Sequence, residues 1–208
     1  MKPEIYNAYV KILHEELVPA MGCTEPIAIA YASALARDTL GTMPERMEVQ
    51  ASGNLIKNVK SVVVPNTGGL KGLEAAAAAG IVAGKEDKIL EVISEVTQAQ
   101  KAEIARFMQV CPIRVLPDES DVVFAITLTL RAGEDTVRLA ITDYHTHIVL
   151  IERNGEVLLK DGKASDANSG LTDRSVLSVA VICDFADSCD LTDVRELVGK
   201  QIAYNYAI

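Results

Sequence analysis

Residues 122–159, VVFAITLTLRAGEDTVRLAITDYHTHIVLIERNGEVLL, decide the fold class of this chain. Apolar and β-branched residues alternate with polar ones along this stretch, which is typical of strands that bury one face. The connections AGED at 132–135 and RNGE at 153–156 indicate hairpin turns, and Asn154-Gly155 is the strongest such signal in the chain. The pattern predicts a meander of four antiparallel strands, to which residues 113–116 would add a fifth.

Helical periodicity flanks this β region on both sides. The expected helices are 3–18, 27–40 (with a cap at Thr24), 73–83, 87–108 in one or two pieces, 172–185 (with a cap at Thr172 or Asp173) and 192–208. Two short strands are expected at 47–51 and 59–64, separated by a turn at Ser52-Gly53-Asn54. The sequence therefore predicts an α+β fold, a helical domain with an inserted antiparallel β-meander.

Three regions follow from this pattern. Residues 1–110 would form the helical domain, 111–165 the β unit, and 166–208 helices that return to the first domain. The Ala-rich helix at 73–83 predicts close helix packing. The last helix has no stop signal after its apolar residues, which is what a truncated chain would look like.

Composition excludes several classes of function. The chain has 208 residues, 49% of them hydrophobic and 24% charged, with a net charge of −9. An acidic chain with 4% aromatic residues and no Trp lacks the basic surface and stacking platforms that nucleic acids and anionic membranes require. The polar N-terminus does not resemble an export signal, and no CxxC pair is present. We expect a cytoplasmic protein with reduced thiols.

Cys23 is the first candidate for chemistry. It stands between Gly22 and the expected cap Thr24, so the amino end of the following helix should lower the pKa of its thiol. The alternative is a small buried residue, which is what most unpaired cysteines are. A nucleophilic role would require a base nearby, and a ligand role would require further thiolates.

Two glycine-containing loops are the next candidates. Residues 52–54 (SGN) and 66–69 (NTGG) place hydroxyl and amide side chains beside glycines, and backbone N–H groups in such turns can bind a carboxylate or phosphate. Lys57, Lys60 and Lys71 lie close in sequence. The alternative is that both loops are simply tight turns. Neither loop has the spacing of a phosphate-binding P-loop or of a dinucleotide-binding motif.

The remaining candidates carry weaker signals. His145 and His147 would face the same side of a strand and could bind a metal, although an exposed strand end explains them equally well. Cys183 and Cys189 are interpreted as structural thiols. With three histidines in the chain, a Ser-His-Asp triad has little support.

Three segments together resemble the N-terminal half of the L-cysteine desulfidase family, also described as serine dehydratase α-chain-like proteins. They are MGCTEPIAIAYA at 21–32, SGNLIKNVKSVVVPNTGGLKG at 52–72 and NSGLTDRSVLSV at 168–179. The resemblance implies a lyase that converts L-cysteine to pyruvate, ammonia and sulfide, or L-serine to pyruvate and ammonia, without pyridoxal phosphate. It also implies that Cys23 is one of three thiolates holding a [4Fe–4S] cluster, whose open iron acts as a Lewis acid on the leaving group.

The resemblance extends to the residues around the substrate. The expected substrate-binding residues are Thr24, Glu25, Ser52, Gly53, Asn54, Asn66, Thr67, Gly68 and Gly69. Lys57 and Lys71, together with Lys60, are candidates for the catalytic base, and a residue outside this chain is an equal candidate.

The chain departs from that family in its thiols. The other two cluster cysteines lie in the family's C-terminal half, and Cys111, Cys183 and Cys189 do not match them. We therefore expect this polypeptide alone to lack the cluster and to be inactive, with the other half as a missing segment or a second chain. Self-association into a homo-oligomer is expected, because a truncated core would expose apolar helix faces. The alternatives are a small-molecule-binding or regulatory α+β module without catalysis, and a structural protein.

Overall fold

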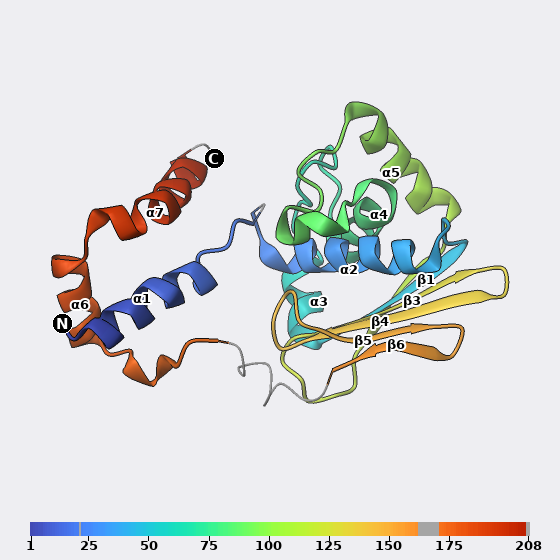
Figure 1. Ribbon diagram of the computed structural model, residues 1–208. Coiled ribbons are helices and arrows are strands. Elements are labelled where there is room, and N and C mark those ends of the chain that lie inside the picture. The colour runs from blue at the N-terminus through green and yellow to red at the C-terminus, as the bar shows by residue number, and fades with distance from the viewer. Residues whose placement is uncertain (21, 162–170, 207–208) are drawn as a thin grey trace. The chain divides into compact units, whose positions relative to one another are not determined.

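The structure is a computed structural model that describes residues 1–20, 22–161 and 171–206 (Figure 1). It has the mixed α+β character that the sequence predicts, and it divides into two compact units. The sheet unit is Ala20–Ala164, and the helical unit combines Met1–Pro19 with Ser165–Ile208. The expected boundary near residue 165, Met21 and residues 168–170 lie outside the described residues.

This division differs from the three regions expected from the sequence. A boundary at residue 110 would cut through the sheet, because a strand before that point pairs with two strands after it. Residues 1–19 do not belong with the helices that follow them but with the last part of the chain. The two divisions differ because strand pairing and helix docking join segments that are distant in sequence.

One six-stranded sheet organises the sheet unit, in the order β2-β1-β3-β4-β5-β6. Its strands are β1 (Arg46–Ala51), β2 (Ile113–Pro117), β3 (Ala125–Ala132), β4 (Asp135–Thr142), β5 (Ile148–Arg153) and β6 (Glu156–Lys160). The predicted meander of β3 to β6 is confirmed. The additional strand β2 exists, but it pairs in parallel with β1 at the opposite edge. Asn154 (φ 53°) and Gly155 (φ 84°) form the predicted turn, since both adopt the positive φ of a type I′ hairpin.

The helices of this unit include one that the sequence analysis missed. The helical segments are α2 (Thr24–Leu40), α3 (Gly53–Val59), α4 (Gly72–Ala83), the 3-10 helix η1 (Glu86–Glu91) and α5 (Gln98–Val110). The expected turn at 52–54 is the start of α3, and the expected strand at 59–64 is wrong. Leu55 and Val59 lie four residues apart and are both buried, as expected for one face of a helix. Within the expected strand at 59–64, the structure has a single isolated β-bridge, from Val63 to Lys71.

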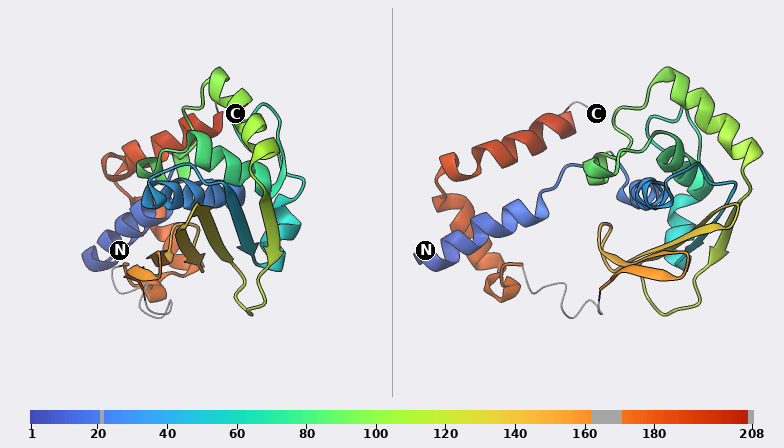
Figure 2. Two further views of the ribbon diagram at one scale, coloured as in Figure 1. Left: turned by 90° about the vertical axis from the view of Figure 1, so that its right-hand side faces the viewer. Right: turned by 45° about the vertical axis from the view of Figure 1, so that its right-hand side comes forward.

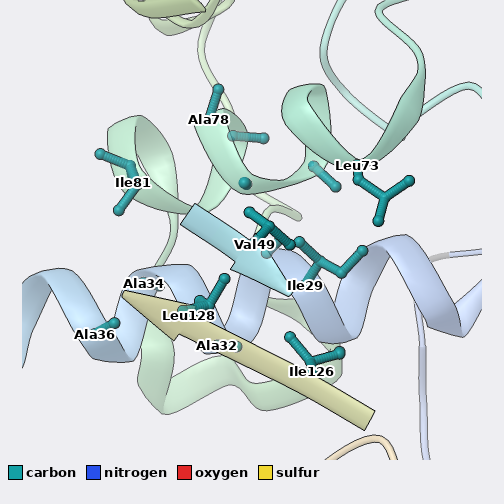
Figure 3. Packing of buried hydrophobic residues seen from close by; sticks show 14 of the residues in the cluster. Ile29, Ala32, Ala34, Ala36, Val49, Leu73, Ala78, Ile81, Ile126 and Leu128 are labelled. Carbon is teal, nitrogen blue, oxygen red and sulfur yellow. The ribbon is translucent and has the colours of Figure 1, made fainter. Parts of the chain in front are cut away.

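The core lies between the sheet and the helices α2 and α4. Helices α2, α4 and α5 lie on one face of the sheet (Figure 2), and Figure 3 shows Ile29 and Leu128 among the residues that meet there. The predicted close helix packing is confirmed at Gly80, where an added Cβ would lie 2.1 Å from the carbonyl oxygen of Ala30. Small side chains are required because the two backbones approach this closely.

The helical unit has a much smaller core. It consists of α1 (Pro3–Glu16), the 3-10 turn η2 (Arg174–Val176), α6 (Val179–Ser188) and α7 (Leu191–Tyr206). Its buried cluster is Tyr9, Phe185 and Val194, with the Tyr9 and Phe185 rings 5.2 Å apart. Among the described residues, no helix of either unit combines the length and apolar character needed to cross a bilayer.

Two caps shape the last part of the helical unit. Asp173, one of the two expected caps, caps η2. The longer helix α6, which was expected to follow Thr172 or Asp173 directly, is capped by Ser178 instead.

The Glu15 carboxylate of α1 accepts hydrogen bonds from the backbone N–H and hydroxyl of Thr172 and pairs with Arg174. These contacts fix the chain after residue 171 to the end of α1.

Candidate functional site

Cys23 occupies the N-cap position of α2 and is exposed. Its thiol donates a hydrogen bond to Oε2 of Glu25 at 3.1 Å. Partial burial and this carboxylate raise the pKa of the Cys23 thiol, although the backbone N–H of Glu25 acts in the opposite direction. The expected lowering of the pKa by the helix dipole is therefore wrong. Burial disfavours the thiolate most, and the Glu25 carboxylate adds to this because it would repel a thiolate beside it.

Glu25 links the start of α2 to α3. Its Oε1 accepts a hydrogen bond of 2.8 Å from the side-chain amide of Asn58, so both carboxylate oxygens have a donor. Asn54, an expected substrate-binding residue, lies one helical turn before Asn58 on the same face of α3. Asn58 is not among the expected site residues, because no local sequence signal marks it.

His145 reaches the same place from the loop between β4 and β5. Its Nε2 lies 3.0 Å from the hydroxyl of Thr24, and its ring lies 4.6 Å from that of Phe124. Burial lowers the pKa of His145, with the Glu25 charge opposing the shift. Burial therefore favours the neutral form of this imidazole.

The second histidine of that loop has other partners. His147 Nδ1 lies 3.2 Å from the carbonyl oxygen of Thr142, and its Nε2 lies 3.4 Å from Asp161 Oδ2. The two histidines do not form the metal pair that the sequence left open. Within residues 1–20, 22–161 and 171–206, no three His, Cys, Asp or Glu side chains are placed to hold a metal ion.

The loop that follows Pro65 adjoins the Cys23 turn. A Cβ added at Gly22 would lie 3.7 Å from Cγ of Pro65. The Thr67 hydroxyl, however, is buried and donates to the Val64 carbonyl at 2.7 Å while accepting from the Leu70 N–H at 3.1 Å.

Asn66 is also tied to its own surroundings. Its side-chain amide donates to the carbonyl oxygens of Ile93 and Ser94 at 3.0 and 3.2 Å. Gly68 and Gly69 adopt positive φ values of 77° and 95°, and a Cβ at either would meet open space. The side chains of Asn66 and Thr67 thus hold the loop, whereas the two glycines leave its backbone accessible.

The other expected site residues lie around α3. Ser52 is buried, donates to the Val123 carbonyl at 2.9 Å and so ties the end of β1 to the start of β3. Gly53 and Asn54 are exposed in the first turn of α3. Lys57, Lys60 and Lys71 are exposed as well.

The lysines are not joined to the cysteine. In the part of the chain that the structure describes, none of these lysines forms a hydrogen bond or ion pair with residues 22–25.

These contacts define one cluster at a single edge of the sheet. We call Cys23, Thr24, Glu25, Asn58 and His145 the α2 cluster. It lies where β1 and β4 end and β3 and β5 begin. Open hollows at the opposite end of α2, lined by residues such as Arg37 and Met43, contain none of the expected site residues.

Comparison with known proteins gives similarity without an activity. No family model matches the chain. A UPF0597 protein of Desulfitobacterium hafniense is 55% identical over 203 residues, which are 98% of this chain and 47% of that protein. UPF0597 proteins of Fusobacterium nucleatum and Treponema denticola are 46% and 39% identical, over 96% and 98% of this chain and 47% of each relative.

The shared name is a family designation and specifies no reaction. The chain spans about half the length of the curated relatives it matches. Along nearly all of its residues, it is therefore similar to about half of a UPF0597 protein.

Proposed function

We propose that this chain is the substrate-binding half of an iron–sulfur-dependent amino-acid lyase, acting in the cytoplasm on L-cysteine or L-serine without pyridoxal phosphate. The likeness of residues 21–32 and 52–72 to the L-cysteine desulfidase family supports this proposal. The observation that carries it is the α2 cluster, in which the Cys23 thiol contacts the Glu25 carboxylate and the His145 imidazole contacts the hydroxyl of Thr24 between them in sequence, at the amino end of one helix.

We expect that the chain does not hold a [4Fe–4S] cluster by itself. Such a cluster is bound by several thiolates, and Cys23 is the one exposed cysteine among the described residues of the sheet unit. Cys111 is buried, and its thiol faces the carbonyl of Pro44 at 3.6 Å. Cys183 and Cys189 do not match the cluster cysteines of the family that the chain resembles, so we expect the remaining thiolates to come from outside this chain, and no step of the reaction is assigned to the cluster on these residues.

The residues of this chain can bind the substrate. The N-cap side chain of α2 makes no capping hydrogen bond. Pro26 has no N–H, and the backbone N–H of Glu25 acts on the Cys23 thiol, so in the first turn the backbone N–H of Thr24 can donate to an α-carboxylate. The backbone of Gly68 and Gly69 in the adjoining loop provides further donors. Asn54 and Asn58 on α3 can donate to the same carboxylate or accept from the α-amino group.

His145 is the proton acceptor that the geometry favours. Removal of the Cα proton requires an unprotonated base, and burial, which lowers the pKa of His145, favours the unprotonated imidazole. Its contact with the Thr24 hydroxyl places it beside the residue next to Cys23. Lys57 and Lys71 remain proposals for the same role, without a contact to the α2 cluster in the described structure.

The experiment is a chimera that supplies the missing half. Residues 1–208 are fused to the part of the Desulfitobacterium hafniense relative that they do not match, and the fusion is reconstituted anaerobically with iron and sulfide. We expect about four irons per chain and pyruvate release from L-cysteine or L-serine. Cys23→Ser should abolish both, whereas Cys183→Ser serves as the matched control and should retain both. A fusion whose iron content is unchanged by Cys23→Ser would contradict the proposal.

His145 has its own variant in the same fusion. His145→Gln keeps a hydrogen-bonding side chain beside Thr24 but removes the titrating group. We expect full iron content with a loss of kcat of about a hundredfold or more, as for removal of a general base. If His145→Gln leaves kcat unchanged, His145 is not the base, and Lys57→Met and Lys71→Met are the variants to measure next.

A binding module without catalysis is the second candidate, favoured by the raised pKa of Cys23 and by the lack of further ligands in the described residues. Calorimetry on the iron-free chain separates the two. Tight binding of L-cysteine or L-serine by this chain alone, with no pyruvate formed by the fusion, would favour the binding module.

A further inference from the structure

The apolar stripe of α7 extends beyond the surface that covers it. Val194 is buried in the small core of the helical unit, and Val198, one turn later, packs against that core. Ile202 and Tyr206 continue the same spacing but are 64% and 92% exposed. The stripe therefore begins as a core face and ends in solvent.

Helix α6 has a second apolar face. Val181 and Phe185 pack in the core with Tyr6 and Tyr9 of α1. Val179 and Ile182 point elsewhere and are 79% and 48% exposed. Together with Cys183 and Ala186, which are also exposed, they recur at the spacing i, i+3, i+4, i+7 of a single helix face. We call this face and the end of the α7 stripe the α6–α7 surface.

A unit with this core is not expected to be stable alone. Tyr9, Ile12, Phe185 and Val194 are its buried apolar side chains among the described residues. Small domains are marginal because they bury too little of the surface of their unfolded chain. Exposed apolar faces on such a unit mark an interaction surface.

The relatives indicate what covers it. Each of the relatives described above has about as much sequence again as the part that this chain matches. We propose that the α6–α7 surface binds that additional part of the longer proteins, burying Val179, Ile182, Ile202 and Tyr206. This inference rests on the exposed stripes and on the lengths of the relatives, and it does not require that the proposed lyase function is correct.

Cys183 provides a native probe of this surface. It lies on the exposed face of α6, whereas Cys111 is buried and Cys23 belongs to the sheet unit. The full chain is alkylated with iodoacetamide, in chelator and without iron, with and without the part of the Desulfitobacterium hafniense relative that it does not match. We expect Cys183 to react about a hundredfold more slowly when that partner is present at about a hundred times its Kd.

Matched variants locate the effect. Ile182→Glu and Ile202→Glu should each abolish the protection of Cys183, because a buried carboxylate would oppose docking. Leu158→Glu on β6 is the control, because Leu158 is 54% exposed and apolar but lies in the sheet unit, and protection should persist. If the separate partner does not fold, the same labelling is carried out on the fusion of the two parts.

Several results would overturn the inference. Protection that survives both variants would place the partner elsewhere. If protection of Cys183 rises with the concentration of this chain in the absence of the partner, a second copy of the chain covers the surface. If Cys183 is protected in a dilute solution of the chain alone, the surface is covered within one molecule. Unprotected Cys183 in the fusion would exclude docking on this surface. Because iron is excluded throughout, a failure of the lyase proposal leaves this result unchanged.

Discussion

The sheet unit and the helical unit use apolar residues in opposite ways. In the sheet unit, Ile29 and Ala78 are fully buried, and α2 and α4 are buried over most of their surfaces. In the helical unit, α6 and α7 bury one side chain each, Phe185 and Val194. The first unit is therefore a scaffold fixed by packing, on which the α2 cluster is held. The second presents apolar side chains in the manner of an interface.

The largest expected difference between the two units is the cost of removing an apolar side chain. Leu128 is fully buried in the sheet unit, so Leu128→Ala should lower the free energy of unfolding by about 2–5 kcal/mol. Ile182 is 48% exposed on α6, and Ile182→Ala should change the free energy of unfolding by less than about 0.5 kcal/mol. Urea denaturation of the full chain measures both. Equal losses would mean that the α6 face is part of a core.

Glycines give the second contrast. Gly80→Ala would place a Cβ 2.1 Å from the carbonyl oxygen of Ala30, and the forced shift should destabilise the sheet unit by about 1–3 kcal/mol or more. A Cβ at Gly199 in α7 meets open space, so Gly199→Ala should stabilise that helix by up to about 1 kcal/mol. Thermal denaturation followed by circular dichroism reports the sign of each change. Two changes of the same sign would contradict the comparison.

The sequence predicted best what depends on local pattern. The strands β3 to β6 and the Asn154-Gly155 turn follow from alternation and from residues that tolerate positive φ. The parallel pairing of β1 with β2 joins residues more than sixty positions apart, which no local signal encodes. Helix α3 was missed because the SGN segment is equally typical of a turn and of a helix start.

The candidate site was predicted only in part, for the same reason. Cys23 was selected from its position before a helix, and it is exposed there. The contact between Thr24 and His145 spans 121 residues, so no local pattern indicates that these two residues meet. The pKa of the thiol is raised and not lowered, because burial of Cys23 and the position of the Glu25 side chain, neither of which is visible in the sequence, act against the thiolate.

The third prediction concerns the reactivity of thiols on the two units. Since Glu25 contributes to the raised pKa of Cys23, Glu25→Gln should lower that pKa and speed alkylation of Cys23 at neutral pH. The alkylation rate of Cys183 on α6 should not respond, because Glu25 lies in the other unit. The rate of each cysteine against pH, read by mass spectrometry, tests this. If Glu25→Gln leaves the pH dependence of Cys23 alkylation unchanged, the Glu25 carboxylate does not act on the Cys23 thiol.

The smallest expected effects are at acidic pH, at Glu95 of the sheet unit and Glu15 of the helical unit. Hydrogen bonds from Lys85 and Lys88 lower the pKa of Glu95 to about 2. Burial opposes the shift at Glu15, but hydrogen bonds from Thr172 and Arg174 bring its pKa below the ordinary value.

Both pKa values are lowered on folding, so each contribution to stability is complete above the ordinary glutamate pKa and is lost as the pH falls through the lowered one. NMR titration of both carboxylates measures the two values. A Glu15 titrating at its ordinary pKa would show that residues 172–174 do not hold the end of α1.

Hydrogen exchange on the intact chain alone, resolved by residue, tests the difference between the two units most directly. If the sheet unit is a closed scaffold and the helical unit an uncovered interface, amides of α2 and α4 will exchange only through global unfolding, and those of α6 and residues 199–206 will exchange through local opening, orders of magnitude faster. Equal protection in α4, α6 and α7 would show that the helical unit already has a complete core.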